Sequence, residues 1–181
     1  IVFINGFFSK EYSRIISPES EISLTPLGVA LSDNNPAAQN HFSKHADFKA
    51  DSLTAWNTSA WTDGIFLHVK KNQTVGKPII IHHLQDAAEE VVTVSRNLIV
   101  SDGGSKVTLI EKFDSTGQAN HFSNHVTEIV VGENAEVNFY SIQNDSGNRY
   151  QYNLTQLYQL NNSRVNTFSF KRSSCSFCLS A

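Results

Sequence analysis

Cysteine and histidine are the residues of this 181-residue chain with the clearest capacity for chemistry. Cys175 and Cys178 have the spacing of a redox pair or of half a zinc site. A structural zinc ion needs four ligands, and the sequence contains no other cysteine. We therefore expect this pair to be an incidental part of the C-terminal tail, without a ligand role.

His41 and His45 are four residues apart in a segment that we expect to be helical, so one metal ion could bridge them. Asp47 is the one further ligand evident nearby. Because that set is incomplete, we expect the two histidines to lie on a solvated helix face.

The other histidine pairs lie in regions where we expect strands. His82 and His83 are adjacent, so their side chains should point to opposite faces of a strand, one to the core and one to solvent. His121 and His125 flank a Phe-Ser-Asn segment in an expected turn-to-strand region. These two pairs are better candidates for a metal or partner contact than His41 and His45. No catalytic residue, cofactor-binding residue or metal ligand is assigned.

Several catalytic motifs are absent from the sequence. It has no G-x-x-x-x-G-K-[ST] phosphate loop and no G-x-S-x-G elbow, so any ATP would be bound by a partner and we expect no enzyme activity. The net charge of −3 includes no basic block, which argues against nucleic acid. No apolar stretch approaches the roughly 20 residues of a membrane span. With only two cysteines, a cytoplasmic protein is favoured over a disulfide-rich secreted one.

The elements that must position these residues follow a repeated pattern: an apolar run, a polar turn and a valine that opens a second alternating run. The valines are Val75, Val107, Val137 and Val165, so the steps are 32, 30 and 28 residues. A nearly fixed step of this size indicates stacked repeats. We expect the valines at equivalent positions of successive units.

Two all-β folds fit the period-two alternation after residue 64. A jelly roll or cupin-like barrel would carry histidine metal ligands inside, but cupin ligands usually include two histidines separated by one residue, and no H-x-H occurs. A parallel β-helix with two strands per repeat fits the valine step better. A polysaccharide-acting β-helix enzyme would need acidic and basic side chains clustered on one strand face, and no such cluster is evident.

Residues 1–62 differ in texture from residues 63–181, which we expect to form the β-helix core. Asn5-Gly6 predicts a hairpin turn between two short strands. Three short helices should follow. The first carries Leu27 and Leu31, the second begins at Pro36 and carries Ala38, Phe42 and His45, and the third includes residues 51–56. The chain lacks methionine and begins within an apolar run, so we expect it to be a piece of a longer protein.

Several segments together resemble the SufB/SufD family of iron–sulfur cluster assembly proteins. Trp61-Thr62-Asp63-Gly64 opens a run that resembles the start of the family core, and Asn57-Thr58-Ser59-Ala60 resembles its lead-in. The segments at 96–100 and 126–135 are similar to the next two core segments, in the same order and at the same separations. The absence of SufB-type cysteines and the opening helical zone favour SufD.

The resemblance implies a right-handed parallel β-helix in a subunit of the SUF iron–sulfur cluster assembly complex. It implies a scaffold function through contacts with a SufB-like partner and a SufC-like ATPase, with the cluster handled by the full complex and no cofactor in this chain. The regions that the family uses for these contacts would follow residue 170, so no cluster ligand is carried over.

The tail from Lys171 to Ala181 departs from the family pattern, as a truncation or cloning remnant would. A β-helix that stops there would expose a strand edge and apolar core side chains, among which we expect Phe168 and Phe170. We therefore expect the chain to self-associate through its C-terminal edge.

Overall fold

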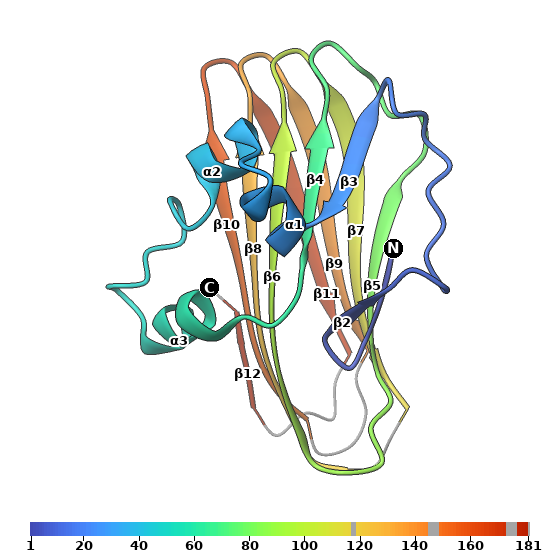
Figure 1. Cartoon of the computed structure of the whole chain (residues 1–181), viewed down its shortest axis with the longest axis vertical. Coiled ribbons are helices and arrows are strands. Elements are labelled where there is room, and N and C mark those ends of the chain that lie inside the picture. The colour runs from blue at the N-terminus through green and yellow to red at the C-terminus, as the bar shows by residue number, and fades with distance from the viewer. Residues whose placement is uncertain (117–118, 145–148, 173–176, 181) are drawn as a thin grey trace.

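The computed structural model describes residues 1–116, 119–144, 149–172 and 177–180. Over these residues the strands form two facing sheets of six (Figure 1). The strands of the first, sheet A, are β1 (Val2–Ile4), β2 (Phe7–Ser9), β5 (Ile79–Gln85), β7 (Lys106–Ser115), β9 (Glu136–Asn144) and β11 (Arg164–Lys171). The strands of the second, sheet B, are β3 (Ile22–Pro26), β4 (Ile65–Val69), β6 (Val91–Ser101), β8 (His121–Val131), β10 (Arg149–Gln159) and β12 (Phe177–Ser180).

From β4 onward the chain alternates between the two sheets, and from β6 onward each new strand pairs in parallel with the strand two before it. Sheet A has the order β11-β9-β7-β5-β1-β2, and sheet B has the order β12-β10-β8-β6-β4-β3. This is a parallel β-helix, which confirms the fold inferred from the valine step. The jelly-roll and cupin-like alternative is wrong, because those folds are built from antiparallel pairs.

The four valines occupy equivalent positions in successive coils. Val137 pairs with Val107 on one side and with Val165 on the other. Val75 lies just before β5. It donates its backbone N–H to the carbonyl oxygen of Lys106, the residue before Val107, at 2.9 Å. The repeat read from the sequence is therefore the coil of the β-helix.

The polar turns repeat because each contains a residue in the left-handed conformation three positions before its valine. These residues are Asn72, Gly104, Asn134 and Asn162, with φ angles of 60°, 69°, 58° and 56°. Asparagine and glycine are the residues that adopt this conformation most readily. Backbone hydrogen bonds also join the stacked turns, as from Gly104 N–H to Glu133 O.

The N-terminal segment closes one end of both sheets. Asn5 and Gly6 form the expected hairpin turn, with φ angles of 49° and 85°, and β1 pairs in parallel with β5 while β2 pairs antiparallel with β1. On sheet B, β3 pairs antiparallel with β4. Thus strands from residues 1–62 belong to the same two sheets as the core.

Three short helices cover sheet B: α1 (Leu27–Ser32), α2 (Pro36–His41) and α3 (Ser52–Ala60). Asn35 and Asp51 cap α2 and α3, since the side chain of each accepts two backbone N–H groups. Apolar side chains of α1 and α2 pack against outward-facing residues of β4, β6 and β8, including Phe66, Leu98 and Val130. The described helices include none long and apolar enough to span a membrane.

The second helix is shorter than the sequence pattern indicated. It ends at His41, with Phe42 as its C-cap, so the expectation that His45 lies on it is wrong. The physical reason is that Ser43 adopts a left-handed φ of 56°. The backbone N–H groups that a longer helix would have used, those of Ser43, His45 and Ala46, donate instead to the carboxylate of Glu128.

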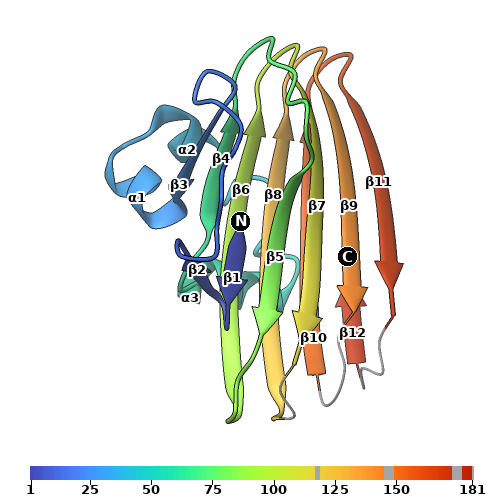
Figure 2. The same ribbon diagram turned by 90° about the vertical axis from the view of Figure 1, so that its right-hand side faces the viewer.

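In the described part of the chain no helix lies on the outer face of sheet A, whereas the helices cover sheet B (Figure 2). Four large side chains lie in register across this face and form what we call the outer apolar row: Ile80, Ile110, Tyr140 and Phe168. The expectation that Phe168 and Phe170 belong to the core is wrong. Their strand partners are Tyr140 and Ile142, which alternate with the core residues Val137 and Phe139.

Candidate functional site

The space between the sheets, which we call the lumen, is apolar at one end and polar at the other. Lumen-facing residues near the valine turns are aliphatic or aromatic, and they form the main core cluster. Farther along the same strands the buried side chains become polar. They include His83 and Gln85 on β5, Glu111 on β7, Ser95 and Asn97 on β6, and His121, Ser123, His125 and Thr127 on β8.

A His–Glu–His cluster, made of His83, Glu111 and His125, lies in the polar half. Glu111 Oε1 is 3.3 Å from His83 Nε2 and 2.9 Å from His125 Nε2. All three side chains are almost completely buried. Among the residues that the structure describes, this is the one group of three His, Cys, Asp or Glu side chains close enough to hold a metal ion.

Neighbouring side chains fix the orientation of the cluster. The His83 ring is stacked between Phe3 and Phe113, with ring centroids 4.8 and 4.7 Å away. Ser95 Oγ lies 2.7 Å from His125 Nδ1, which directs the other ring nitrogen of His125 towards Glu111.

Two further groups complete the environment of the carboxylate. Thr127 Oγ1 and Asn97 Nδ2 donate to Glu111 Oε1 at 3.1 and 3.4 Å. The rings and the carboxylate are thus held by contacts from both sheets.

The buried environment sets the protonation of the cluster. Burial lowers the pKa of His83 to about 4, and the nearby His125 acts in the same direction. Burial would raise the pKa of Glu111, but the charge and hydrogen bonds of His125 and His83 outweigh it and hold that pKa below its ordinary value. At neutral pH the cluster therefore holds an ionised carboxylate beside a neutral imidazole.

The structure brings together one member of each of the two favoured histidine pairs. His83 faces the lumen, and His82 lies on the outer face beside Asp114, which confirms the opposite orientations expected from the sequence. His121 is the first residue of β8 and His125 also lies in this strand, so the strand expected in this turn-to-strand region begins at His121. Glu111 was missed, although it follows Val107 and Leu109 at period two and therefore had to face the interior.

The remaining candidate ligands do not form a site of three donors in the described part of the chain. His41 Nδ1 and His45 Nε2 are 3.2 Å apart, and the His45 ring stacks on Tyr158. Asp47 instead accepts the backbone N–H of Lys49. Cys175 lies outside the described residues, and the backbone of Cys178 belongs to β12, so the Cys-x-x-Cys spacing stays a sequence observation.

Among the motif residues, Asn57, Arg96 and Glu128 form one buried network between the helices and sheet B. Arg96 donates through Nε and Nη2 to Glu128 Oε2, and through Nη1 to Asn57 Oδ1. Burial raises the pKa of Glu128, but Arg96 and the backbone donors outweigh it and hold that pKa below its ordinary value. Asn97 Oδ1 accepts the N–H of Ile65. These residues position the coils and the N-terminal segment.

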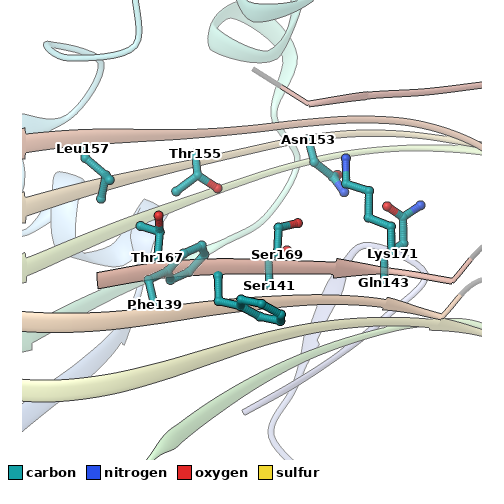
Figure 3. Close-up of a pocket in the computed structure, with 10 residues that line it drawn as sticks. Phe139, Ser141, Gln143, Asn153, Thr155, Leu157, Thr167, Ser169 and Lys171 are labelled. Carbon is teal, nitrogen blue, oxygen red and sulfur yellow. The ribbon is translucent and has the colours of Figure 1, made fainter. Parts of the chain in front are cut away.

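A cavity of about 240 Å³ lies at the β10–β11 end of the lumen (Figure 3). Its walls come from β9, β10 and β11. The lumen-facing residues among its lining are Phe139, Ser141, Gln143, Asn153, Thr155, Leu157, Thr167, Ser169 and Lys171. The polar character of the lumen thus extends to the coil formed by β10 and β11.

Comparison with known proteins assigns the whole architecture to one family. A family model described as "SUF system FeS cluster assembly, SufBD core domain" matches residues 83–176. A second, described as "SufBD protein N-terminal region", matches residues 1–81. The chain belongs to the SufBD family.

SufBD relatives are similar over most of this chain. An iron-sulfur cluster assembly SufBD family protein of Synechocystis is 28% identical over 173 residues, covering 91% of this chain and 38% of the relative. SufBD family proteins of Staphylococcus saprophyticus and Staphylococcus aureus are 24% and 25% identical, each covering 82% of this chain and 33% of the relative. The chain therefore spans little more than a third of the length of these relatives.

Proposed function

We propose that this chain acts as a scaffold, without turnover of its own, in a cytoplasmic SUF iron–sulfur cluster assembly complex, in the manner of a SufD subunit. It would act through contacts with a SufB-like partner and a SufC-like ATPase. In this proposal the cluster is cargo of the whole complex, and ATP is bound by the SufC-like subunit. The observation that carries the proposal is SufBD membership across nearly all of the chain.

Two structural features support a scaffold. A parallel β-helix is stiff, because each coil is hydrogen-bonded to its neighbours along its full length. The outer apolar row also leaves large side chains accessible, with Ile80 50% and Phe168 60% exposed. An exposed apolar row of this kind is typical of a protein-contact surface.

Co-purification tests the proposal. The tagged chain, co-expressed with the SufB-like and SufC-like subunits of its source organism, should elute with at least one of them in a complex of defined mass by size-exclusion light scattering. Elution of the chain without either subunit would contradict the proposal.

Two variants test which surface makes the contact. Tyr140→Asp, in the outer apolar row, should weaken the complex at least tenfold. Asn138→Asp, on the same face of β9, is the matched control and should bind as the wild type does. Equal binding by both variants would remove the row from the contact but leave the scaffold function standing.

A further inference from the structure

The carboxylate oxygen of the His–Glu–His cluster lies close to both imidazole nitrogens, at separations near those between two ligands of one metal ion. Ligands bound at about 2.0–2.1 Å to a tetrahedral ion lie about 3.3 Å apart. Glu111 Oε1 lies 3.3 and 2.9 Å from the two imidazole nitrogens, and all three donor atoms are within 4.8 Å of one another. We propose that His83, Glu111 and His125 bind one divalent transition-metal ion inside the β-helix.

The ligand types narrow the class of ion. Two imidazole nitrogens and one carboxylate suit zinc, cobalt or ferrous ions, whereas magnesium and calcium prefer sites built from oxygen. One carboxylate charge against a divalent ion leaves the site with a single positive charge. This proposal departs from the sequence-based expectation that the chain holds no metal.

The cluster is held in place as a ligand set must be. Phe3 and Phe113 clamp the His83 ring from both sides, and Ser95 holds His125 through its Nδ1 atom. A contact of this second kind fixes which ring nitrogen faces the metal. Phe3, Phe113 and Ser95 all lie on packed strands. The donor atoms are therefore already close together, and no loop has to move to bring them together.

The polar atoms of the lumen could also accommodate a water molecule as a further metal ligand. Three protein ligands leave an open position that a water molecule commonly fills. Nearby, Ser123 Oγ and His121 Nδ1 are buried and have no hydrogen-bond partner among the described residues. Buried polar atoms of this kind are usually satisfied by ordered water.

Metal loading tests the proposal. Because the cluster is enclosed, the full chain is unfolded in urea and refolded with one equivalent of Zn²⁺ or Co²⁺, and then dialysed. We expect one ion per chain, visible d–d absorption from the cobalt form, and X-ray absorption showing nitrogen and oxygen neighbours without sulfur. A wild-type chain that regains its far-UV circular dichroism but retains no metal would overturn the proposal and leave a proton as the bridge between Glu111 and His125.

Matched variants assign the ligands. His83→Gln and Glu111→Gln should each lower metal affinity at least tenfold. His82→Gln removes the adjacent histidine on the outer face of β5, outside the cluster, and should bind as the wild type does. Should either ligand variant fail to refold, the wild-type experiment still decides.

A double variant, C175S/C178S, tests the tail cysteines as a competing site. It should bind metal as the wild type does. Metal retained by the His83 and Glu111 variants but lost from the double variant would place the site in the tail and contradict the proposal.

Discussion

The buried residue His121 shows how a polar lumen makes the stability of the folded chain depend on pH. Its side chain is 2% exposed, and Nε2 lies 3.2 Å from Thr93 Oγ1. Burial and, to a lesser extent, the positive charge of Arg149 together lower the pKa of His121 to about 4. The imidazole is therefore neutral in the folded chain at pH values where an unfolded chain would protonate it.

This difference predicts acid sensitivity. Because the folded pKa lies below the unfolded value of about 6.5, the unfolded chain binds more protons between pH 6.5 and 4. The free energy of unfolding should therefore be highest above pH 6.5 and should fall as the pH drops towards 4. Each such histidine, His83 included, contributes up to about 1.4 kcal/mol per pH unit.

Urea denaturation of variants at pH 7, 5.5 and 4.5 measures the effect. His121→Gln should reduce the pH dependence by up to about 1.4 kcal/mol per unit. Ser123→Ala, an uncharged change in the same lumen, should keep the wild-type dependence. Equal slopes for His121→Gln and the wild type would show that His121 titrates normally in the folded chain.

At the scale of elements, the contact between β4 and β6 depends on one glycine. A Cβ at position 64 would lie 1.6 Å from the carbonyl oxygen of Arg96. Gly64 is followed directly by β4, and its own carbonyl accepts the N–H of Leu27, where α1 begins. The glycine of the family-like Thr-Asp-Gly segment is therefore required by backbone contact.

Gly64→Ala should lower the free energy of unfolding by at least about 3 kcal/mol, because the backbone of β6 must move to admit the methyl group. Gly76→Ala is the control, since a Cβ there meets no atom within 4 Å. We expect it to stay within about 1 kcal/mol of the wild type in urea denaturation. Similar losses in both variants would mean that β4 and β6 do not approach each other this closely.

The fully buried pair of Arg96 and Glu128 joins the helical segment to sheet B. Glu128→Gln would place an amide group against three backbone donors and a guanidinium, so a loss of about 3–5 kcal/mol is expected. Limited proteolysis should then cut the segment around residues 42–50 first. Glu136→Gln, which alters the exposed pair with Lys106, should change neither stability nor cleavage noticeably.

The strands of the β-helix could be predicted from the sequence more completely than the His–Glu–His cluster. The β-helix could be predicted because Asn or Gly in each turn and a valine three residues later repeat at a nearly constant step. In β5 and β7, alternating aliphatic residues show which side chains face the lumen. The sequence of β8 does not show this, because residues 121–125 contain no alternating apolar pattern, so nothing in the sequence placed His125 opposite Glu111.

At the scale of the molecule, β11 pairs in parallel with β9, and the described residues place no strand on its other edge. Arg164 and Arg172 donate their N–H groups towards β9, so the odd-numbered N–H groups between them point away from it. Such an edge is a template for another chain.

We predict that the isolated chain self-associates through this edge at micromolar concentration. Ser169→Pro removes one outward N–H without removing a bond to β9, so it should shift the chain towards monomer in light scattering. Asn166→Pro, which removes an inward donor, should destabilise β11 instead. A wild-type chain that is monomeric at these concentrations would contradict the prediction.

The short strands β2 and β3 make the two ends of the β-helix different. They run antiparallel to their neighbours and close the end of the β-helix that is made first during synthesis. Each later coil can therefore stack on strands that have already been synthesised, and the order of translation matches the order of stacking. Whole coils of about 30 residues could be added or removed at the other end over evolutionary time without disturbing this starting surface.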